Sequence, residues 1–447
     1  MKRTILILSV LVYYSFGGWA QKAPWTFQQC LDTALKRNIS VNQTILANEL
    51  NKISLEQSKA NRIPSVSASV GETYNIGKNV DATTNQFVIG TFHSGNYGLN
   101  ASYNLFNGLQ NNNTIKQYKL NIEAGKFNIE NAKNAVILSV TTGYLQILLE
   151  YEILKTTQNQ LSADSIQVDR TQKQLNVGKA AEGDLLLIKS QLATDYLSYV
   201  NAQTQLDLGR VTLMQLMQIP VIDNFDVEVP KFAEPGLDLL LSQDVIYQKA
   251  LAVMPQIQAA SLNTSSSKMA IKVATGARWP RLTFSGGLSS NYASSRKQGT
   301  AVNPENYPWY SQVWDNVGQA LNLGLSIPIY SNRSLQSGIE RAIINSKTAA
   351  LNELNTQQTL RMNIEQTYTS LKAAAKSYEA GKVQLSSTEM SYLNAEKKYN
   401  VGVMSTTDYL IQKNSYISSL SSLIQTKFNF IFQSKILDFY QGKAITF

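Results

Sequence analysis

Residues 319–330 read QALNLGLSIPIY, a stretch in which apolar side chains occupy every second position. The apolar positions are Leu321, Leu323, Leu325, Ile327 and Ile329. Alternation with a period of two predicts a β-strand, because successive side chains of a strand point to opposite faces. One face of this strand is therefore apolar, and the other carries only uncharged residues.

Three more segments, 65–76, 96–105 and 281–292, repeat this pattern with mostly small, uncharged residues opposite the apolar ones. Transmembrane β-strands alternate in this way, because one face meets lipid and the other a wet interior. A half-buried strand of a soluble sheet also alternates and is the alternative interpretation. Glu72 is an exception on the apolar face, where we expect it to lie near an interface, to pair with a partner or to mark a bulge.

The chain contains an internal duplication. The tripeptide Asn176-Val177-Gly178 recurs 224 positions later as Asn400-Val401-Gly402, and the helix-ending prolines Pro64 and Pro280 are 216 positions apart. The second copy therefore has eight extra residues in its strand region. The predicted organisation is an export signal (1–20), a first copy (21–219), a linker (220–243), a second copy (244–440) and a C-terminal tail (441–447).

Each copy contains one very long helical segment. Residues 109–175 lack proline, and their apolar residues recur at spacings of three and four, as in a coiled coil. We expect each long helix to end near its tip glycine and to be followed by an antiparallel partner, 184–217 or 407–440. A shorter helix is predicted before each strand pair, at 27–61 and 245–277. The seam positions are Val136, Val140, Tyr144, Ile147, Tyr151 and Leu154, which recur as Leu360, Ile364, Tyr368, Leu371, Ala375 and Tyr378.

The composition excludes several kinds of site. The 447 residues include one Cys and one His, which excludes a Cys-rich or multi-His metal site and an intramolecular disulfide. Neither nucleophile elbow nor phosphate loop is present, so we expect no enzyme activity and no cofactor. Basic residues are dispersed, which disfavours nucleic-acid binding. Cys30 is predicted to be a small buried residue, and His93 a solvated loop residue.

Four strands cannot close a barrel, and in lipid every backbone polar group must be paired within the structure. Neighbouring copies of the chain must therefore supply strands. A dimer would give eight strands and a filled interior, whereas a trimer would give twelve strands and a lumen. We predict the trimer, with 78–94 and 293–316 as long loops on the far side.

The order of helix, strand pair, long helix, glycine tip and helix, found twice, resembles the TolC-type outer-membrane efflux channels. The resemblance implies a homotrimer whose 12-stranded transmembrane β-barrel, four strands per protomer, continues into a long periplasmic coiled-coil α-helical barrel. It also implies an outer-membrane location, contact with outer-membrane lipid, and a passive role in small-molecule efflux or type I secretion. A periplasmic adaptor would connect the duct to an inner-membrane transporter of the RND or ABC type.

By the same resemblance, the turns Val177-Gly178 and Val401-Gly402 are the adaptor-docking tips. Asp408 matches the first member of the family's constricting aspartate pair, but the second falls on Ile411. Asp408 and its counterpart in the first copy, Asp184, are therefore the candidate residues of the pore constriction. Both aspartates have an alternative role as helix caps, because a side-chain oxygen there can accept free backbone N–H groups. A periplasmic adaptor and a trimeric surface structural protein are the competing functions, although neither explains strands within both copies.

Overall fold

The computed structural model describes residues 24–80, 85–230, 242–300 and 303–446. The predicted export signal and part of the predicted linker lie outside the described residues. The described chain forms two compact units. A helical unit contains residues 24–42, 130–254 and 359–446, and a sheet-containing unit contains residues 43–129 and 255–358.

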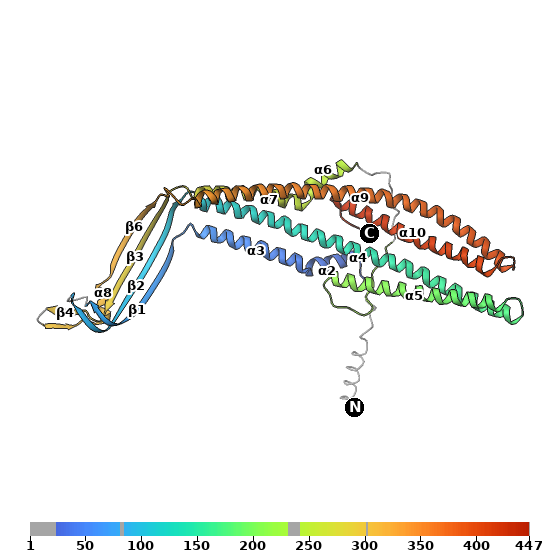
Figure 1. Cartoon of the computed structure of the whole chain (residues 1–447), viewed down its shortest axis with the longest axis horizontal. Coiled ribbons are helices and arrows are strands. Elements are labelled where there is room, and N and C mark those ends of the chain that lie inside the picture. Colours follow the sequence, from blue (N-terminus) through green and yellow to red (C-terminus); the bar gives the residue numbers. More distant parts are fainter. Residues whose placement is uncertain (1–23, 81–84, 231–241, 301–302, 447) are drawn as a thin grey trace, which may run out of the picture. The chain divides into compact units, whose positions relative to one another are not determined.

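Two helical hairpins dominate the helical unit (Figure 1). The long helices α4 and α9 both have 67 residues, and the returning helices α5 and α10 both have 35. The prediction of two long helices and two returning helices is confirmed. Their bounds are Gln110–Asn176 for α4, Glu182–Leu216 for α5, Ser334–Asn400 for α9 and Thr406–Tyr440 for α10.

The prediction of one unbroken short helix in each copy is wrong. The first copy has α2 (Phe27–Arg37) and α3 (Ile39–Ala60), and the second has α6 (Gln243–Val253) and α7 (Pro255–Gly276). Asn38 leaves the helical conformation, and its side chain accepts a hydrogen bond from Val41 N (3.1 Å) to begin the next helix. Met254 is extended because it precedes a proline.

Four antiparallel strands form one sheet in the order β1-β2-β3-β6, which confirms the strand prediction. The bounds are Ser65–Val80 for β1, Phe87–Asn107 for β2, Arg281–Ala293 for β3 and Gly318–Ser326 for β6. The last strand is shorter than predicted because Pro328 cannot donate to the ladder.

Both predicted loops are instead partly structured. Residues 78–94 mostly continue strands β1 and β2, which pair as far as Val80 and Phe87. Residues 293–316 contain a small hairpin, β4 (Lys297–Thr300) and β5 (Asn303–Asn306), followed by the helix α8 (Trp309–Asp315). Period-two alternation fades at the far ends of the strands, so it could not mark their true length.

The predicted coiled-coil seam forms much of the core of the helical unit. Val140 and Ile147 are fully buried in the first copy, and Ile364 is fully buried in the second. Cys30 is buried as predicted, and burial raises the pKa of its thiol to about 12. None of the helices in the described part of the chain combines the length and apolarity that a bilayer crossing needs.

Candidate functional site

The two hairpin tips have matching backbones. Gly178 and Gly402 adopt φ angles of 72° and 80°, in the left-handed region that favours glycine. The preceding valines are prominent on the surface, with Val177 67% exposed and Val401 74% exposed. A Cβ atom added to either glycine would meet nothing within 4 Å, so backbone conformation alone selects glycine here. Each tip therefore presents a bare Val-Gly turn.

The two aspartates lie in the first turns of the returning helices, but neither is the N-cap residue itself. Ala181 occupies that position in α5, and Ser405 occupies it in α10. Asp184 Oδ2 accepts a long hydrogen bond of 3.4 Å from Ala181 N, so it contributes to capping from within the helix. In α10 the predicted capping role of Asp408 is wrong, because Ser405 is the cap. Ser405 Oγ accepts a hydrogen bond from Asp408 N at 3.1 Å and donates its hydroxyl to Asp408 Oδ2 at 2.7 Å.

The surroundings of these two carboxylates differ. Asp184 is half-buried, and its Oδ1 accepts a 2.6 Å hydrogen bond from Thr406 at the start of the other hairpin's returning helix. Asp408 is exposed. Asp184 therefore joins the two hairpins, whereas Asp408 leaves its charge available to solvent.

Polar contacts that the sequence did not indicate also link the two hairpins. Lys413 of α10 forms an ion pair with Asp164 of α4, and the side chains are only 6% and 5% exposed. Burial lowers the pKa of Lys413 to about 8, so the ammonium is still charged at neutral pH. Two hydrogen bonds add to this link, one from α4 to α9 and one from α10 to α5. These are Arg170 Nη1 to Asn400 Oδ1 at 2.6 Å, and Asn414 Nδ2 to Gln191 Oε1 at 3.2 Å.

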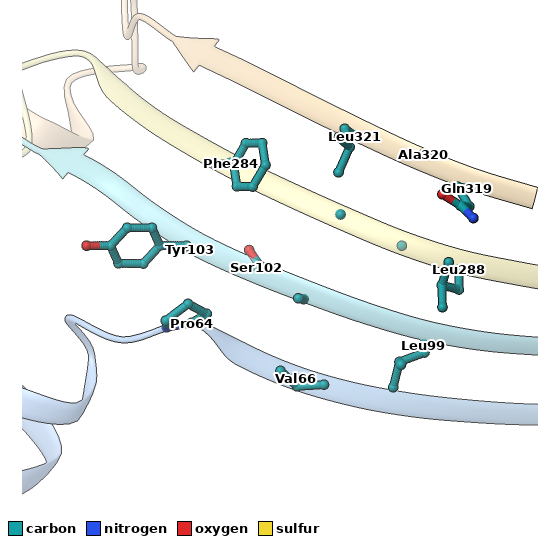
Figure 2. A pocket seen from close by; sticks show the side chains of 13 residues that line it. Pro64, Val66, Leu99, Ser102, Tyr103, Phe284, Leu288, Gln319, Ala320 and Leu321 are labelled. Carbon is teal, nitrogen blue, oxygen red and sulfur yellow. The ribbon is translucent and has the colours of Figure 1, made fainter.

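The strand register assembles one continuous apolar face on the sheet. Paired residues share a face, so the pairs Tyr103↔Phe284 and Phe284↔Leu323 place apolar side chains of three strands together. Figure 2 shows a hollow on this face that spans all four strands. We call this surface the apolar face; its members include Val66, Val70, Tyr97, Leu99, Leu282, Phe284, Leu288 and Leu321.

The opposite face of the sheet is small and polar. Ser67 pairs with Asn100, and Ser102 pairs with Ser285. The faces of the sheet thus keep the segregation predicted from the alternation, with lipid-compatible side chains on one side and water-compatible ones on the other.

Glu72 has partners on the apolar face, which is one of the three expectations for it. Tyr97 donates its hydroxyl to Glu72 Oε1 at 2.5 Å, and His93 Nε2 lies 2.5 Å from Glu72 Oε2. Gly95, which is paired with Glu72, leaves the necessary space, because a Cβ there would come within 2.7 Å of the carboxylate. His93 is therefore a strand residue with an acidic neighbour, and the prediction of a solvated loop residue is wrong. The partners are adjacent only through strand pairing, which the local sequence does not reveal.

The sheet ends in two edge strands, β1 and β6. Their outer backbone groups have no strand partner within the described residues. In the same part of the chain, no group of three or more His, Cys, Asp or Glu side chains is arranged to hold a metal ion.

The family model described as "Outer membrane efflux protein" matches residues 30–217 and 246–430. Outer membrane efflux protein BepC of Brucella suis is 21% identical over 92% of this chain and 84% of its own length. Outer membrane protein TolC of Escherichia coli is 25% identical, over 67% of this chain and 59% of its own length. The crystal structure of the Campylobacter jejuni CmeC outer membrane channel has a TM-score of 0.77 at 17% identity, covering 93% of this chain and 85% of CmeC.

Proposed function

Because this chain belongs to the outer membrane efflux protein family, we propose that it is the passive, trimeric exit duct of a tripartite export system. The protein is located in the outer membrane and has a large periplasmic portion. The family is one of efflux channels and not of enzymes. Small-molecule efflux and type I secretion are the two transport roles that such a duct serves.

The observation that carries the proposal is the open sheet with one apolar face. In hydrocarbon, the outer backbone groups of β1 and β6 would each lack a hydrogen-bond partner, at a cost of several kcal/mol per group. Pairing β6 of one copy with β1 of the next removes both edges and continues the antiparallel order. Three copies give twelve strands, and the small, polar face then lines a lumen wide enough for water.

The tips support a docking role toward a periplasmic adaptor. Val177 and Val401 are apolar and exposed, and each precedes a glycine at which an added Cβ atom would meet nothing within 4 Å. Exposed apolar side chains at the centre of a small patch are typical of protein interfaces. An inner-membrane transporter, reached through the adaptor, would supply the energy for export.

The state of assembly is the first test. Mild-detergent extracts should contain a species of about three times the 49.6 kDa chain mass, measured by light scattering with the detergent contribution subtracted. The same sample should conduct ions in planar bilayers. A monodisperse monomer that forms no conducting pores would contradict the proposal of a trimeric duct.

A second test asks whether the carboxylate of Asp408 contributes to the cation selectivity of the pore. In planar bilayers, Asp408→Asn should lower the preference for cations, because three exposed carboxylates near the pore axis attract them. Asp184→Asn is the matched control, since that carboxylate is engaged by Thr406. Equal selectivity in the wild type and the Asp408→Asn variant would leave Asp408 with only its contact to Ser405.

A further inference from the structure

The helix α8 packs on the apolar face of the sheet. Ser290 Oγ donates to Val313 O at 2.6 Å, and Trp309 Nε1 donates to Tyr97 Oη at 2.7 Å. Ser290 and Tyr97 are paired with each other, and both point to the apolar face. The rings of Tyr97 and Trp309 also meet edge to face at 6.1 Å. Figure 1 shows α8 beside the ends of the strands that are farthest from α3 and α7.

A buried glutamine fixes α8 in this position. Gln312 is 1% exposed, accepts a hydrogen bond from Ala293 N (3.1 Å), and donates to Ala293 O (3.1 Å) and Tyr307 O (2.7 Å). Asn316 Nδ2 donates to Asn291 O at 2.9 Å just beyond the helix. Because these bonds connect α8 to the end of β3, its outward face has a defined orientation.

The outward face of α8 is aromatic. Trp309 is 51% exposed, Tyr310 62% and Trp314 78%. At about 100° per residue, these three positions fall within an arc of about 140° on the helix. Trp and Tyr are enriched where a membrane meets water, because one end of each ring system is apolar and the other can bond to water.

With Arg281 taken as the periplasmic end of the apolar band, the position of α8 along the sheet can be compared with the height of a membrane. Ser290 lies nine residues after Arg281, the first residue of β3. At about 3.3 Å per residue and a tilt of about 45°, this separation corresponds to a height of about 21 Å. The apolar band of a transmembrane barrel is about 25 Å tall, so α8 lies close to its outer edge.

We propose that α8 is an interfacial anchor that places Trp309, Tyr310 and Trp314 among the headgroups and upper acyl chains of the outer leaflet. The proposal rests on the proposed duct, in which the apolar face meets lipid. The aromatic patch on α8 is continuous with that face through the contact between Trp309 and Tyr97. The anchor would therefore fix the height of each protomer in the membrane.

Tryptophan fluorescence in vesicles tests this proposal. Four tryptophans follow the predicted signal, so a variant with Trp25→Phe, Trp279→Phe and Trp309→Phe reports on Trp314 alone. The protein is reconstituted into phosphatidylcholine vesicles whose acyl chains carry bromine at defined depths. Emission from Trp314 should be blue-shifted relative to tryptophan in water. It should be quenched more by bromine near the headgroups than by bromine near the chain ends.

Two further variants make the result decisive. A variant that retains only Trp309 should show the same depth profile. One that retains only Trp25, which packs against Phe225 in the helical unit, should show no quenching by bromine. Water-like emission from both Trp314 and Trp309, quenched by aqueous iodide and not by bromolipid, would overturn the anchor.

Trimer mass and ion conductance, measured on the same vesicles, distinguish this failure from a failure of the duct. A conducting trimer in which both Trp314 and Trp309 are exposed to water refutes only the anchor. Absence of both trimer and conductance refutes the proposed function, and with it the anchor.

Discussion

The two helical hairpins have equal helix lengths and matching tips, yet their buried polar residues differ. In the second hairpin, Thr388 Oγ1 and Ser419 Oγ lie 2.5 Å apart as a neutral hydrogen-bonded pair. The corresponding positions of the first hairpin, 224 residues earlier, hold Asp164 and Asp195, which are 4% and 5% exposed. The same backbone frame thus holds a neutral pair in one copy and two carboxylates in the other.

This difference makes the first hairpin dependent on the second. Burying a carboxylate costs free energy unless a cation or hydrogen bonds compensate it. Lys413 of the second hairpin compensates Asp164, while Asp164 Oδ2 has no hydrogen-bond partner in the described part of the chain. The neutral pair, in contrast, is satisfied within its own hairpin. At Asp164, an ion pair therefore links the two copies.

Removing the compensating cation should have the largest effect. We expect Lys413→Met to lower the free energy of unfolding by about 3–5 kcal/mol, because Asp164 would remain buried without a cation. The measurement is guanidinium unfolding in detergent, followed by the helical circular dichroism signal. Ser419→Ala, in the neutral pair, should cost only about 1 kcal/mol.

Introducing the neutral pair of the second hairpin into the first tests the same comparison more directly. The triple variant Asp164→Thr, Asp195→Ser, Lys413→Met gives the first hairpin the neutral pair of the second. It should recover most of the stability that Lys413→Met loses. If Lys413→Met alone left the unfolding midpoint unchanged, the ion pair would not connect the hairpins energetically.

Replacing the tip glycine should destabilise both hairpin tips equally, since their backbone conformations match. Gly178→Ala and Gly402→Ala should each cost about 1–2 kcal/mol locally, because both residues have positive φ and alanine is strained there. Hydrogen exchange of the amides around each turn would report the loss. A large effect at one tip only would show that the two turns are not energetically equivalent.

The smallest effect concerns Asp195. Burial raises the pKa of its carboxyl above the ordinary value of 3.8. The folded state therefore binds more protons than the unfolded state between the two pKa values, and the free energy of unfolding falls as pH rises through that window. Asp195→Asn should remove this fall and stabilise the helical unit at neutral pH by about 1 kcal/mol.

The matched control for this pH dependence is Asp169→Asn, on the exposed surface of α4. This variant should retain the wild-type dependence on pH. An Asp195→Asn variant with an unchanged pH profile would contradict the assignment to Asp195.

Much of the fold follows from local patterns. The three-and-four spacing gave both long helices to within a few residues, because a helix with an apolar stripe repeats its pattern over many turns. The alternating segments gave all four strands of the sheet. The break at Asn38 was missed, because a single residue that leaves the helical conformation hardly disturbs the apolar spacing around it.

The candidate site was less accessible from the sequence. The tip glycines could be located, because a left-handed turn after a long helix selects glycine. The link between Asp164 and Lys413 could not, since these residues are 249 positions apart and lie on helices of different hairpins. The carboxylate of Glu72 likewise depends on Tyr97 and His93, which only strand register brings to it.

The sequence by itself determined the duplicated plan, the element types and the two-faced strands. These features are encoded by periodicity, and periodicity is a property of consecutive residues. Only the tertiary structure decided which partners Glu72, Asp164 and Gln312 find and that α8 packs on the apolar face. The physical reason is that a buried polar group must find a partner in three dimensions, and the distance along the chain does not limit which partner it finds.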